Sequence, residues 1–173
     1  IGDLAVIFGL KSTGTYRTLS HIETLKIPAV LFNEFVNRNH LLEQIHKTQE
    51  TIEFLQQTWL FGESISSPIQ SQIAQSIKLT KYKKGEKIEY DGLMLVKKGK
   101  VELINRGANK KESLHEVGKG DFWGGEKMIS SNSKCCDARA ITQTDIYSIT
   151  DVEILQNIPI IRWKMLEQTE RRE

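Results

Sequence analysis

Cysteine is scarce in this sequence, and the two residues present, Cys135 and Cys136, are adjacent. Neighbouring cysteines rarely bridge each other, and two thiols alone make a poor zinc site. The four histidines are dispersed, at His21, His40, His46 and His115. A metal-dependent enzyme site would need such ligands to cluster. The composition therefore predicts a reduced, cytoplasmic protein with no metal site and no bound cofactor.

Three further features are missing. The chain has no run of 18 apolar residues, which excludes a membrane-spanning helix, and its net charge of +2 is not the strong basic excess of a dedicated nucleic-acid binder. No phosphate-cradling G-x-x-x-x-G-K-[ST], no G-x-S-x-G and no Cys/His dyad is present. We therefore expect a non-enzymatic protein without direct nucleic-acid contact. Because the first residue is Ile1 rather than methionine, we also expect upstream sequence to be missing.

An internal repeat organises the chain, with an offset of 122 to 124 residues that is typical of one compact domain. Gly2-Asp3 corresponds to Gly125-Glu126, residues 16–19 to 138–141, residues 23–27 to 145–149, and residues 42–44 to 166–168. We interpret this as a tandem duplication in which residues 1–39 are the C-terminal half of a first copy. Coincidental similarity between short segments is the alternative.

The complete copy, residues 58–173, begins with helical signals and continues with short strands. Ser67 as N-cap, Pro68 at the first helical position and Gln70 as capping-box partner predict a helix with Ile69, Ile73 and Ile77 on one face. Glycine turns then separate about eight short apolar segments. Thr150 to Glu153 read as a second capping box, and Pro159 opens a terminal helix. This order predicts a mainly β, jelly-roll (double-stranded β-helix) barrel with flanking helices.

A connecting helix over residues 40–57 is predicted between the copies. There is no glycine or proline from His40 to Leu60. Apolar residues with one polar interruption recur at heptad spacing, at Leu41, Ile45, Thr48, Ile52, Leu55 and Trp59. Such a helix either pairs with a partner, giving a homodimer or a link to an output domain, or packs on its own domain. Both interpretations stay open.

The motifs resemble those of cyclic-nucleotide-binding domains, as found in bacterial catabolite activators, kinase regulatory subunits and nucleotide-gated channels. The resemblance rests on residues 59–61, 82–88, 95–102, 117–126 and 138–140, and residues 1–39 resemble the second half of the same domain. It implies a short helix after the glycine turn whose free N–H groups receive the cyclic phosphate. It also implies a glutamate on the ribose hydroxyl and an arginine fork on the phosphate.

Residue by residue, this resemblance implies a ligand site at Gly124, Gly125, Glu126, Lys127, Lys134, Cys135 and Cys136. Lys134 stands at the arginine position, where it supplies charge without the bidentate pair, and Cys135 replaces a hydroxyl residue. The loop from Tyr90 to Gly92 is shorter than is usual in the family.

The corresponding first-copy site is degenerate, at Gly2, Asp3, Ser12 and Thr13. Asp3 replaces the glutamate, and Ser12 leaves the phosphate without a positive partner. We expect no nucleotide binding in the first copy.

The sequence thus predicts a regulatory sensor module that binds cAMP or cGMP in the second barrel and relays this to a partner or output domain. Two alternatives remain: a degenerate barrel serving as a dimerisation or interaction scaffold, and a fragment of a catabolite-activator-like transcription regulator. A transcription regulator of this kind would require a helix-turn-helix following the barrel.

Overall fold

The computed structural model describes residues 2–11, 14–62, 65–106, 112–125, 136–151, 155 and 157–172. The chain divides into two compact units, residues 1–47 and residues 48–173. In the described residues, no helix has both the length and the apolar character needed to cross a membrane.

Unit 1 contains two helices, α1 (Asp3–Phe8) and α2 (Ala29–Arg38), and the start of α3. Between the first two helices, described residues 14–28 form neither helix nor strand. Their apolar side chains face solvent, with Leu19 98% and Leu25 99% exposed. The predicted repeat aligns residues 16–19 and 23–27 with two strands of the second copy, yet here they form no strand. A strand needs a hydrogen-bonded neighbour, and these residues have none in the sheets described. The duplication therefore stays a prediction.

A connecting helix was predicted over residues 40–57, and the structure has helix α3 at Leu42–Gln56. In unit 2, its last turns are packed against the chain's own core: Leu55 is fully buried, Phe54 is buried, and Ile52 packs beside them. The C-terminal half of the heptad pattern therefore serves intramolecular packing.

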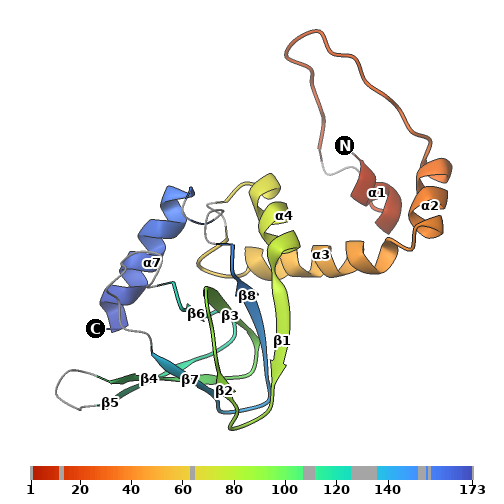
Figure 1. The fold of residues 1–173 in the computed structure, drawn as a ribbon. Coiled ribbons are helices and arrows are strands. Elements are labelled where there is room, and N and C mark those ends of the chain that lie inside the picture. The colour runs from red at the N-terminus through yellow and green to blue at the C-terminus, as the bar shows by residue number, and fades with distance from the viewer. Residues whose placement is uncertain are drawn as a thin grey trace. The chain divides into compact units, whose positions relative to one another are not determined.

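The described residues of unit 2 form two four-stranded antiparallel sheets (Figure 1). The first contains, in spatial order, β1 (Lys78–Tyr82), β8 (Thr144–Ile149), β3 (Leu93–Lys98) and β6 (Phe122–Trp123). The second contains β2 (Lys87–Ile88), β7 (Asp137–Ala140), β4 (Val101–Arg106) and β5 (Glu112–Val117). The predicted β-roll with flanking helices is confirmed, although the Phe122–Trp123 strand was not predicted.

The two faces of the first sheet are buried in different clusters. Met94 and Val96 point into the roll, toward Leu103 and Ala138 of the second sheet. Leu93 and Leu95 pack outward against the helices. Strict alternation along β3 thus explains why its run Leu93–Val96 is apolar at every position, as expected for a strand buried on both faces.

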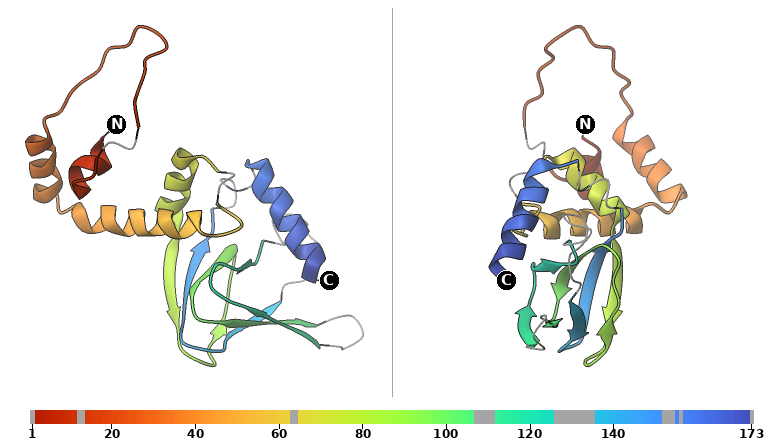
Figure 2. Two further views of the ribbon diagram at one scale, coloured as in Figure 1. Left: turned by 180° about the vertical axis from the view of Figure 1, so that it is seen from behind. Right: turned by 60° about the vertical axis from the view of Figure 1, so that its left-hand side comes forward.

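Helices α4 (Ser67–Ser76) and α7 (Pro159–Arg172) supply the outer layer, as Figures 1 and 2 show. Pro159 opens α7 as predicted. The predicted N-cap was wrong by one residue: Ser66 is the N-cap of α4. Gln70 does not close a capping box: its Oε1 accepts from Gln56 Nε2 at 3.1 Å, and its Nε2 donates to the Phe61 carbonyl oxygen at 3.0 Å. The Thr150–Glu153 capping box falls partly outside the described residues.

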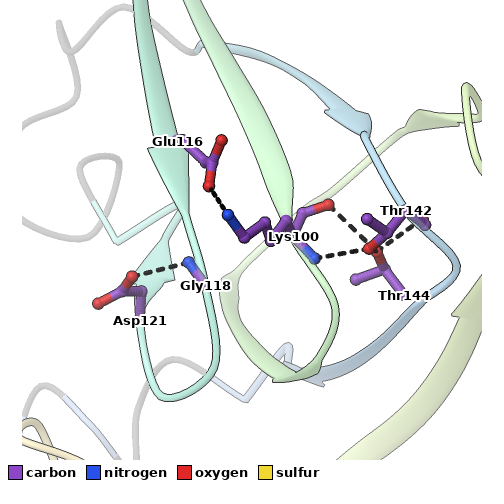
Figure 3. A network of polar contacts seen from close by, with 6 residues as sticks. All are labelled: Lys100, Glu116, Gly118, Asp121, Thr142 and Thr144. Atoms are coloured by element: carbon purple, nitrogen blue, oxygen red, sulfur yellow. Dashed lines mark hydrogen bonds and ion pairs between the residues drawn. The ribbon is translucent and has the colours of Figure 1, made fainter.

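A polar network closes one end of the roll (Figure 3). The Lys100 amide donates to Thr142 Oγ1 at 3.0 Å, and its ammonium pairs with Glu116. Nearby, the Gly118 amide donates to Asp121 Oδ2 at 2.8 Å. This network lies just after the last residue of β3. The candidate site lies at the other end of that strand, where Gly92 precedes Leu93.

Candidate functional site

The turn Gly124–Gly125 directly follows β6 and is buried. Gly124 has φ +84°, a left-handed conformation that favours glycine, and a Cβ there would stand 2.3 Å from the carbonyl oxygen of Gly92. Close approach of two backbones therefore requires glycine at this position. Gly92 itself has φ +129° and lies against Ile149, so the short loop before β3 brings its backbone directly to the turn.

Tyr90 joins the two described edges of the site. Its ring lies 3.0 Å from where a Cβ on Gly124 would be, and its hydroxyl donates to the Cys136 carbonyl oxygen at 2.8 Å. The ring also meets Trp123 edge-on, with centroids 6.0 Å apart. Gly124 and Cys136, both predicted as site residues, are thus brought together by one side chain.

The remaining predicted ligand residues of this copy, Glu126, Lys127, Lys134 and Cys135, lie outside the described residues. Of the ligand residues predicted in this copy, the structure thus describes Gly124, Gly125 and Cys136, and their role in binding stays a prediction.

Helix α7 contacts the turn directly. A Cβ on Gly125 would stand 2.1 Å from Met165 Cε and 3.3 Å from Leu93 Cδ1. Met165 is itself buried and belongs to the outer core cluster. The outward side of Gly125 is therefore filled by a side chain of the terminal helix.

A second contact fixes α7 to the segment before α4. The Lys164 ammonium donates to the Trp59 carbonyl oxygen and lies 5.3 Å from the centroid of the Trp59 ring. That ring stacks on Phe122, with the planes 11° apart and the centroids 6.2 Å apart. Because Phe122 precedes Trp123 on β6, α7 is connected to the strand that delivers the glycine turn.

The structure describes only part of the site predicted for the first copy. Gly2 has φ +85° and precedes α1, whose first turn contains Asp3. Ser12 and Thr13 lie outside the described residues, so the absence of nucleotide binding there stays a prediction.

Within the described parts of the chain, no three His, Cys, Asp or Glu side chains gather closely enough to hold a metal ion. His46 instead packs against the Phe8 ring at a centroid distance of 4.9 Å.

Three residues at the site were missed by sequence reasoning: Tyr90, Trp123 and Met165. Tyr90 and Met165 approach the glycine turn from 34 and 40 residues away along the chain (124 − 90 and 165 − 125), a proximity that no local pattern reveals. Trp123 directly precedes the two glycines in the sequence, and this adjacency was the only sequence feature that could have indicated it as a site residue.

A sequence model of the "Cyclic nucleotide-binding domain" family matches residues 80–158. A curated relative, a cGMP-dependent protein kinase (isozyme 2, forms cD5/T2) of Drosophila melanogaster, is 22% identical over 174 residues. This alignment covers 94% of the present chain and 18% of the kinase. The chain thus spans less than a fifth of the length of that relative.

Two solved structures share the fold. One is a triple mutant of the regulatory subunit of a cAMP-independent protein kinase A from Trypanosoma brucei, bound to cAMP (TM-score 0.62, 17% identity, covering 79% of this chain and 52% of that one). The other is the Trypanosoma cruzi subunit bound to guanosine (TM-score 0.62, 20% identity, covering 73% and 47%). At these identities, the likeness establishes the fold alone.

Proposed function

Residues 80–158 form a domain of the cyclic nucleotide-binding family, and from this premise we propose that unit 2 is a non-catalytic regulatory module. It binds cAMP or cGMP beside the Gly124–Gly125 turn and relays binding to a partner or output domain. In this proposal Glu126 accepts from the ribose hydroxyl, and Lys134 neutralises the cyclic phosphate as a point charge.

The contact between Gly125 and Met165 carries the proposal. A ligand on the interior side of this turn contacts the same backbone that Met165 covers from the outward side, so ligand binding and the position of α7 are energetically linked. Such a module switches only if the ligand has different affinities for two arrangements of that helix. The Lys164–Trp59 contact then gives the change in α7 a route to the segment between α3 and α4.

The proposal is tested by thermal unfolding with cAMP, cGMP, guanosine or no ligand. A ligand at a hundred times its Kd adds about 2.7 kcal/mol to the free energy of unfolding, which raises the melting temperature. We expect Lys134→Arg to strengthen cyclic-nucleotide binding, because the guanidinium adds a bidentate contact, while Lys119→Arg on an exposed turn leaves it unchanged.

Absence of any shift at millimolar nucleotide would refute the binding function. Unchanged or weaker affinity in Lys134→Arg would show instead that Lys134 is not the phosphate partner. A rise in melting temperature with guanosine, but not with cAMP or cGMP, would show that the ligand is a neutral nucleoside and not a cyclic nucleotide.

A second candidate is a roll that has lost nucleotide affinity and serves as a dimerisation scaffold. It requires no ligand at the turn, whose outward side Met165 already fills. In that case the nucleotide titration gives no shift, and sedimentation velocity of the wild-type chain gives a dimer.

We also propose that residues 1–39 are the second half of a first roll. Leu25 and Ile27 are exposed in unit 1, while their counterparts in the repeat, Tyr147 and Ile149, are buried in unit 2. Apolar residues with the spacing of core strands thus lack the sheet that would cover them.

A further inference from the structure

Trp123 is the last residue of β6, and its side chain points into the roll. It is 1% exposed and belongs to the interior cluster, opposite Met94 in the β3–β6 register. Phe122, the residue before it, packs on the other face of the sheet with the helices. Strand alternation therefore places the indole inside the roll, beside the glycine turn.

The indole Nε1–H of Trp123 is buried and has no hydrogen-bond acceptor among the described residues. A buried donor without an acceptor costs about 1–3 kcal/mol, and buried tryptophans usually find a partner for this group. Phenylalanine would fill an apolar interior without this cost. The unsatisfied donor therefore calls for an explanation beyond packing.

The surroundings limit what the acceptor is. The interior side chains include Met94, Val96, Ile146 and Ala138, none of which offers a hydrogen-bond acceptor of ordinary strength. Tyr90 meets the indole edge-on, and its hydroxyl, which donates to the Cys136 carbonyl oxygen, makes no hydrogen bond with the indole Nε1–H. A single neutral donor between apolar walls suits a neutral oxygen or nitrogen acceptor, since an anion would lose its hydration there without a counter-charge.

We propose that Trp123 Nε1–H donates a hydrogen bond to a neutral sugar or base atom of the bound nucleotide, and so helps to select a nucleoside-containing ligand. This inference rests on the proposed function of unit 2. It assigns the phosphate to the glycine turn and the nucleoside to the interior side of Trp123.

The test compares wild type, Trp123→Phe and Trp163→Phe, the last a control at an exposed tryptophan of α7. Without ligand, we expect Trp123→Phe to unfold at a lower temperature, because the smaller ring leaves a cavity in the interior cluster, so the inference is judged on ligand binding alone. With cAMP and cGMP titrated separately by calorimetry, we expect its Kd to rise roughly 3- to 10-fold, the range for one neutral hydrogen bond. The control keeps the wild-type Kd.

A second measurement observes the indole Nε1–H proton of Trp123 by NMR. The chain has three tryptophans, so a ¹H–¹⁵N spectrum contains three indole signals, and the one lost in Trp123→Phe belongs to Trp123. We expect nucleotide to shift this signal and to slow its exchange with solvent. A merely structural role for the ring would leave both unchanged.

The outcomes separate the two proposals. If wild type binds nucleotide, yet Trp123→Phe keeps its Kd and the indole signal does not move, the inference is wrong and the function stands. If wild type binds neither nucleotide, both proposals fail. If the indole N–H of ligand-free protein already exchanges slowly and nucleotide does not slow it further, the indole has a partner without ligand, and this too would overturn the inference.

Discussion

Lys97 illustrates how a single side chain connects a helix to a sheet. Its ammonium lies 2.7 Å from a carboxylate oxygen of Glu50 on α3 and 5.1 Å from the centroid of the Tyr147 ring on β8. Burial alone would lower the pKa of Lys97, but the hydrogen bonds and charges of Glu50 and Tyr147 outweigh this, and the net effect raises it. The charged form of Lys97 is therefore favoured by folding.

This raised pKa predicts a pH dependence. Because the folded-state pKa exceeds the ordinary value of 10.5, the stabilisation is complete below that pH and is lost as the pH rises through the folded-state pKa. Lys97→Met should therefore unfold more easily than wild type at pH 7, by about 0.2–1 kcal/mol, and the difference should shrink above pH 10.5. Denaturant unfolding across this range measures it, with the exposed Lys98→Met as control. A difference that grows with pH would contradict the assignment.

Among the elements, those with strong local signals were predictable. The apolar run Leu93–Val96, the glycine turn at Gly99 and the proline that opens α7 each encode their conformation locally. β6 escaped prediction because two residues are too few to show alternation. The contact of Tyr90 with Cys136 depends on the tertiary fold, which no short pattern specifies.

The extended segment in unit 1 makes a prediction of its own. Ile27 is 65% exposed, whereas Ile149, its counterpart in the predicted repeat, is fully buried in the outer cluster of unit 2. Ile149→Ala should cost about 2–5 kcal/mol of unfolding free energy, as is usual for a core isoleucine. Ile27→Ala should change it by no more than about 0.5 kcal/mol. Chemical denaturation of both variants provides the matched comparison, and an equal loss at Ile27 would show that this residue is covered in solution.

For the molecule as a whole, the feature that matters most is the packing of the terminal helix on the glycine turn. Gly125 and Met165 come from distant parts of the sequence, and their contact links the strand that delivers the turn with the last helix of the chain. The sequence supplied the glycines and the helix separately. Their proximity emerges only when β6 pairs with β3 and α7 packs on the outer face of the same sheet.

Replacing this glycine should therefore loosen α7. Gly125→Ala places a methyl group where Met165 Cε lies, and overpacking of this kind typically costs about 1–3 kcal/mol. We expect faster amide exchange along α7. Gly118→Ala is the control, because a Cβ there meets only Asp121 Oδ2 at 4.0 Å. The same substitution in a Met165→Ala background should cost less, since the space is already free; an equal cost in both backgrounds would place the strain elsewhere.

Helix α3 belongs to both units, with residues 42–47 in one and residues 48–56 in the other. A truncated protein starting at residue 48 would keep only a nine-residue remnant (48 to 56), too short to nucleate stably on its own in water. Phe54 and Leu55 would then depend on docking alone to keep their helical geometry. Recombinant versions of the β-roll should consequently begin ahead of Leu42, even though the compact unit starts later.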